Sequence, residues 1–200
     1  MSDNVAVNIV FNALLCGATG YGLFKIGPSE HPWAFTSCLI GLTHGIVGLV
    51  SGLAGDDTAK KIQETTAAII EIVPLPLVNV DLFLAGECNK IALGHGLFLA
   101  PLTLSVILAF WKTEGGEDEV FGTVHTLKVL TILGNITSLV FLALNEGSGY
   151  MAGMAVLAFV AKFGADPCEE HVYEGSGDPI NYISWSAFFI LTAFAVSGEK

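Results

Sequence analysis

The 200-residue sequence contains no arginine and few charged residues of any kind. Only 14% of its residues are charged, whereas soluble domains average about 25%. All eight basic residues are lysines, and the nineteen acidic residues bring the formal net charge to −11. Because phosphate binding needs clustered lysine and arginine, this composition argues against a nucleic-acid partner.

Hydrophobic residues fill the place of the missing charges. They make up 52% of the chain, and the mean hydropathy is +0.66. These values exclude a disordered chain, a disulfide-rich miniprotein and an ordinary cytosolic enzyme. We predict an all-α fold, a polytopic transmembrane helical bundle that forms a single integral membrane domain over residues 1–200, with the lipid bilayer as its surroundings.

Seven apolar segments are long enough to consider as membrane helices. A spanning helix needs about 20 residues, with a range of about 17–25. The last two segments are at the short end of this range, so six helices with one re-entrant segment and seven helices both stay open. The segments cover residues 5–27, 33–55, 65–86, 90–112, 120–145, 148–164 and 180–197.

Cysteine and histidine give no clear sign of a cofactor. The four cysteines suggest no disulfide framework, and the acidic loop 166–171 lacks the paired spacing of a zinc site. A b-type haem needs two histidines at nearly one depth, but His44, His95 and His125 fall at three different depths. A haem redox protein is therefore our third hypothesis, and the cofactor is left unknown. Enzyme motifs such as a nucleophile elbow or a phosphate-binding loop are absent from the sequence.

The second segment has glycines at helical spacing, at Gly41, Gly45, Gly48 and Gly52. Small residues at this spacing let two helix backbones approach closely. The partner helix is either the first segment of the same chain or another chain. The second case would make the protein a scaffold that forms a homo-oligomer or binds another membrane protein.

Several ionisable residues lie inside the apolar segments, where an unpaired charge is costly. Counting depth along alternating helices groups Asp81 with His95, and Glu71 with His125 or Lys128. Each pair would offset the cost of removing its charges from water. Asn79 and Asn135 are uncharged polar residues in the same segments. One interpretation is that all these residues form structural bridges or reach toward the membrane surface, and the other is that they form a pathway.

Pro74 and Pro76 lie near the middle of the third segment and predict a broken helix there. A broken helix at membrane depth is tolerated where it is buried or lines a cavity, so two interpretations stay open: a bent packing helix, or a site formed by the third, fourth and fifth segments. Our leading hypothesis is movement of protons, cations or a small polar solute. Glu71 and Asp81 would bind or relay the cation, while His95 and His125 would assist by protonation. Asn79 and Asn135 would supply uncharged ligands.

Overall fold

The computed structural model describes residues 2–86, 89–97, 99–111 and 118–198. Within these ranges all regular structure is helical, as the sequence predicts. The elements are α1 (Ser2–Lys25), α2 (Pro32–Ala54), α3 (Asp57–Ile72), α4 (Pro74–Ala85), the 3-10 helix η1 (Asn89–Gly96), α5 (Leu99–Trp111), α6 (Asp118–Glu146), α7 (Gly149–Phe163), α8 (Ala165–His171) and α9 (Gly177–Ser197).

Six stretches of the described chain are helical, long and apolar enough to cross a membrane, which confirms the predicted number of six to seven. Helix α7 is the seventh candidate. Its 15 residues extend only about 22 Å, less than the hydrocarbon core of about 30 Å. It reaches the necessary length only together with the polar helix α8, and the two are bent by 47°.

Helices α3 and α9 are among those that begin earlier than the apolar pattern predicts. The third segment was expected from residue 65, but α3 begins at Asp57 because the side chain of Asp56 accepts a hydrogen bond from the Ala59 N–H, at 2.7 Å. The first two turns of α3 are polar, so the apolar pattern does not reveal them, although they belong to the same helix. The last segment was expected from residue 180, and α9 begins at Gly177.

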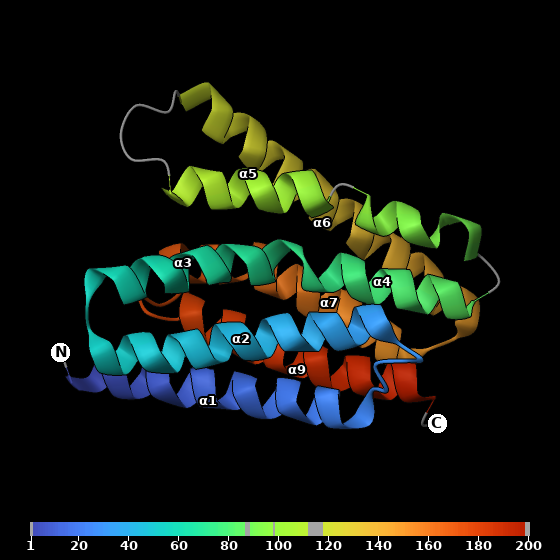
Figure 1. The fold of residues 1–200 in the computed structure, drawn as a ribbon, viewed down its shortest axis with the longest axis horizontal. Coiled ribbons are helices and arrows are strands. Elements are labelled where there is room, and N and C mark those ends of the chain that lie inside the picture. The colour runs from blue at the N-terminus through green and yellow to red at the C-terminus, as the bar shows by residue number, and fades with distance from the viewer. Residues whose placement is uncertain (1, 87–88, 98, 112–117, 199–200) are drawn as a thin grey trace.

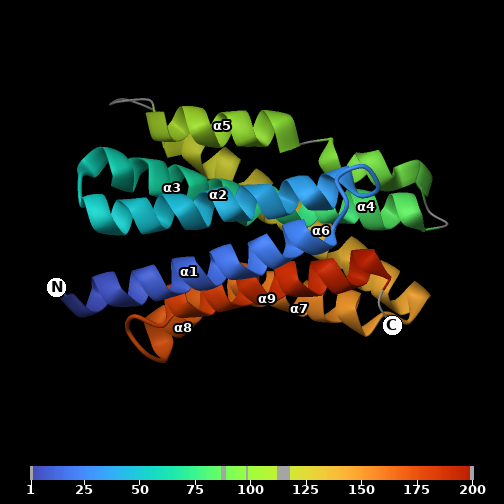
Figure 2. The same ribbon diagram turned by 60° about the horizontal axis from the view of Figure 1, so that its bottom comes forward.

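The helices run back and forth along one long axis (Figure 1), so that the two ends of the chain lie at opposite ends of the bundle. Helix α1 packs between α2 and α9, and α7 packs on α9 (Figure 2). Helix α5 lies at the opposite side of the bundle from α9 and α7. The continuous pair α3 and α4 occupies the middle and contacts α2, α5, α6 and η1.

The predicted break in the third segment is present and short. Proline has no N–H, so Pro74 and Pro76 cannot donate to the carbonyl groups one turn earlier. Helix α3 ends at Ile72 and α4 starts at Pro74, while the Val73 N–H still donates to the Ile69 carbonyl at 3.0 Å. Together they form one 29-residue candidate span, Asp57–Ala85.

The helix that follows the break is closely packed, which agrees with the interpretation as a bent packing helix. Every residue from Pro74 to Phe83 is buried, since α2, η1 and α6 pack around α4. The hydroxyl of Ser37 on α2 donates to the Pro74 carbonyl at 3.3 Å. This part of the chain is therefore the packed core of the bundle.

The glycines of α2 lie against neighbouring helices of the same chain. A Cβ on Gly45 would come within 3.2 Å of the Asn12 carbonyl oxygen on α1, and a Cβ on Gly48 would overlap the Asn12 side chain. At Gly41 a Cβ would lie 2.7 Å from the ring of Phe189 on α9. Gly52 is looser, with Ile9 at 3.7 Å. Gly41, Gly45 and Gly48 are thus buried against α1 and α9 of the same chain, and Gly52 is half-buried.

Candidate functional site

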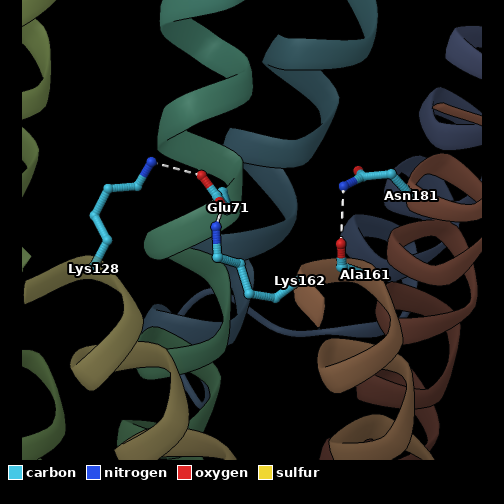
Figure 3. Close-up of polar contacts among 5 residues, drawn as sticks. All are labelled: Glu71, Lys128, Ala161, Lys162 and Asn181. Carbon is cyan, nitrogen blue, oxygen red and sulfur yellow. Dashed lines mark hydrogen bonds and ion pairs between the residues drawn. The ribbon is translucent and has the colours of Figure 1, made fainter. Parts of the chain in front are cut away.

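Glu71 lies at the centre of the span Asp57–Ala85 and contacts two lysines from other helices (Figure 3). Its Oε2 atom is 2.7 Å from the Nζ atom of Lys128 on α6, and its Oε1 atom pairs with Lys162 on α7. The three side chains are 22%, 16% and 13% exposed, respectively. Three helices distant in sequence are therefore joined by one carboxylate.

Lys162 was not among the predicted site residues. It occupies the last turn of α7, where the partial negative charge of the helix end favours a cation. The negative charge of Asp166 on α8 also attracts the Lys162 ammonium group. Helix α7 ends at the end of the bundle where α3 begins (Figure 1), so counting depth from that end brings Lys162 toward Glu71.

Of the two partners predicted for Glu71, only Lys128 is in place. His125 lies nearly one turn earlier on α6 and is exposed. Within the described ranges no contact joins it to Glu71. Lys128 has a longer side chain than histidine, and its ammonium group reaches Glu71 on α3 instead.

A cavity of about 490 Å³ extends beside this ion-pair cluster. Its walls come from α1, α2, α3, α6 and α9. Of the three segments predicted to form a site, the third and the fifth therefore line this cavity, whereas the fourth contributes no lining residue. The charged residues on its wall are Glu64, Glu71, Lys128 and Asp178. Glu64, halfway along α3, and Asp178, in the first turn of α9, are exposed, whereas Glu71 lies halfway along the span Asp57–Ala85. The cavity thus leads from one end of the bundle toward the middle.

A hydrogen-bonded histidine lines the same cavity. His44, near the middle of α2, is 4% exposed, and its Nδ1 atom is 2.8 Å from the Thr66 hydroxyl. That hydroxyl donates its proton to the Gln63 carbonyl, so the hydrogen bond with His44 requires the proton on Nδ1. The Tyr182 hydroxyl lies 3.4 Å from Nε2, and the two rings are stacked. Both ring nitrogens face protein groups, which leaves neither to ligate a haem iron.

Asp81 does not pair with His95, and this prediction is corrected. The Asp81 carboxylate is 3% exposed and accepts the Ala34 N–H in the first turn of α2. N–H groups in a first turn have no partner within their own helix and carry partial positive charge, so a carboxylate satisfies them well. Asp81 joins α4 to the start of α2 and has no place in the cavity.

His95 and the two asparagines gather in the other half of the bundle. The Nδ2 atom of Asn79 on α4 donates to the carbonyl of Asn135 on α6 at 2.9 Å and to its side-chain oxygen at 3.0 Å. His95 lies beside the Asn135 side chain, with its ring 4.4 Å from that of Phe83. Asn79 follows Glu71 by about 12 Å along the helix axis. Glu71 with Lys128, and Asn79 with Asn135 and His95, thus form two separate clusters, while Asp81 contacts the start of α2 and His125 is exposed.

Replacing Asp81 with alanine should lower stability rather than function. The buried N–H of Ala34 would lose its acceptor, which costs about 1–3 kcal/mol. Asp81→Asn retains an acceptor oxygen and should cost less. Thermal unfolding in detergent measures both. Equal midpoints for the alanine variant and the unaltered chain would contradict the capping role.

No metal site emerges from the residues that the structure describes, where no three His, Cys, Asp or Glu side chains come together. The acidic loop predicted near residue 170 includes the short helix α8. There the Glu169 carboxylate accepts the N–H groups of Gly175, at 2.8 Å, and Gly177, at 2.7 Å. These hydrogen bonds stabilise the turn that leads into α9, which gives the Glu169 carboxylate a structural role.

Comparison with known proteins identifies a family. The family described as "Domain of unknown function (DUF4791)" matches residues 28–196, which include every member of the ion-pair cluster. No curated protein and no solved structure matches the chain.

Proposed function

The chain belongs to the DUF4791 family, and from its geometry we propose that it is a multi-pass integral membrane protein that binds a small polar solute around Glu71 and moves it across the bilayer. The observation that carries this proposal is the cavity, which leads from one end of the bundle to charged groups at mid-span.

The outer surface supports a location in the membrane. Large apolar side chains point outward from several helices, among them Phe24 at 85%, Leu144 at 79% and Leu53 at 77% exposure. Soluble proteins rarely expose extended apolar surfaces, whereas a lipid-facing helix requires them. With six candidate spans, these surfaces favour a bundle surrounded by lipid.

The position of the charges supports a functional site. Ionisable residues at membrane depth are costly, face the interior of a bundle and commonly mark a substrate path. Many transporters bind their substrates near the bilayer midplane, where Glu71 would lie. A polar solute fits the cluster better than a bare cation, because both oxygens of Glu71 already contact lysine ammonium groups.

Passage also needs a route through the other half of the bundle. There the core around α4 is closed, and the Asn79–Asn135 pair is buried within it. Movement of α4 against α3 at the proline break would open this half. Alternating opening of two halves around a central site is the mechanism of many secondary transporters.

Flux into vesicles tests this proposal. The unaltered chain reconstituted in lipid vesicles should speed the uptake of at least one of urea, glycerol and glycine over protein-free vesicles, as measured by light scattering after osmotic shock. Glu71→Gln should reduce the added rate about tenfold, equivalent to about 1.4 kcal/mol. The matched control Glu170→Gln, on exposed α8, should leave it unchanged.

A second variant covers the case in which Glu71→Gln does not fold. Ala67 lines the cavity, and Ala67→Trp would fill part of it without altering any charge. It should also slow uptake. Rates equal to protein-free vesicles for all three solutes, or unchanged uptake in both variants, would refute the proposal.

A further inference from the structure

Negative and positive side chains lie at different depths in the cavity. At its outer end, Glu64 on α3 and Asp178 on α9 present exposed carboxylates. At the inner end, Lys128 presents an ammonium group whose one acidic partner in the described part of the chain is Glu71. The cavity is thus rich in acceptors at its opening and contains a cation deeper in.

The inner end also holds hydrogen-bond donors in excess. An ammonium group has three N–H donors, and Glu71 takes one from Lys128. Trp185 lines the cavity and is 3% exposed, yet its indole N–H has no acceptor among the described residues. An indole nitrogen can only donate, and buried donors in proteins are nearly always paired. This wall therefore lacks an acceptor, which a bound carboxylate would supply.

We propose that the solute is a zwitterion of the α-amino acid class, an inference that rests on the proposed function. Its carboxylate would face Lys128 and Trp185, and its ammonium group would face Glu64 and Asp178. Ala67, Ala68 and Ile70 form an apolar part of the wall that suits a hydrocarbon side chain. The volume of about 490 Å³ lies within the range of pockets that enclose small molecules.

A matched set of ligands tests this assignment. L-leucine carries both charges, leucinamide only the ammonium group and N-acetylleucine only the carboxylate. Titration calorimetry on the purified full chain in detergent should give leucine at least a tenfold lower Kd than either analogue. Lys128→Met should weaken leucine binding at least tenfold, because Glu71 keeps Lys162 while the carboxylate loses its cation. Lys60→Met, at an exposed position on the same end of the bundle, is the control.

The outcomes separate this inference from the proposed function. Uptake of urea or glycerol that depends on Glu71, with leucine binding no tighter than its two analogues, would overturn the zwitterion and retain the polar-solute site. An unchanged leucine Kd in Lys128→Met would also overturn it. Vesicles that take up no polar solute would remove both.

Discussion

Gly45→Leu should destabilise the folded chain by about 3 kcal/mol or more, at the upper end of the cost of overpacking. The new Cβ would lie 2.6 Å from the Cys16 Sγ atom, 3.2 Å from the Asn12 carbonyl oxygen and 3.4 Å from the Cys16 backbone nitrogen. The Cys16 side chain can change its rotamer, but the backbone atoms of Asn12 and Cys16 can move away only if the whole of α1 shifts. Thermal or denaturant unfolding in detergent measures the loss.

Gly17→Leu is the matched control for this prediction. Gly17 lies on α1, and a Cβ added there would have no atom of another helix within 4 Å, so the same substitution meets no obstacle there. Leucine favours helix over glycine by up to about 1 kcal/mol, and this variant should be as stable as the unaltered chain or more so. Equal stability of the two variants would contradict the packing of α1 on α2. A stable monomer from Gly45→Leu and an oligomer from the unaltered chain would instead place the glycines at an interface between copies.

Glu71→Gln should have the second large effect on stability. It leaves Lys128 and Lys162 without their shared carboxylate at positions only 16% and 13% exposed. Removing one partner from a buried ion pair costs about 3–5 kcal/mol, and the partial exposure here favours about 3 kcal/mol. Unfolding midpoints in detergent measure this loss, with Glu170→Gln unchanged as the control.

The triple variant Glu71→Leu, Lys128→Met, Lys162→Met should recover most of that stability. It replaces all three charges with apolar groups of similar size, a change that is often neutral in proteins. Equal destabilisation of the single and triple variants would show that the charges do not interact. A stable triple variant without solute uptake would separate the role of the cluster in folding from its role in function.

The sequence predicts the spans well because their signal is local. Apolar length defines each helix, and the missing N–H groups of Pro74 and Pro76 require the break after Ile72. Depth counting also places Lys128 level with Glu71, and these two side chains do meet. Along the bundle axis, position in sequence translates directly into position in space, since each helical residue adds about 1.5 Å.

Direction around the helix axis is what the sequence does not supply. Asp81 and His95 share a depth, yet Asp81 turns toward the start of α2 while His95 turns toward Phe83. The cavity likewise depends on how α1, α2, α6 and α9 are placed around α3, which no local pattern encodes. The sequence therefore predicts which residues are costly to bury, and the packing decides which of them face a common space.

The central claim is that the cavity around Glu71 is the path of a polar solute. The most direct measurement is the ratio of solute uptake by vesicles containing Glu71→Gln to uptake by vesicles containing Glu170→Gln, at equal amounts of folded protein. The account predicts a ratio of about one tenth, the loss expected for about 1.4 kcal/mol. A ratio of one, with both variants faster than protein-free vesicles, would show that the solute crosses elsewhere.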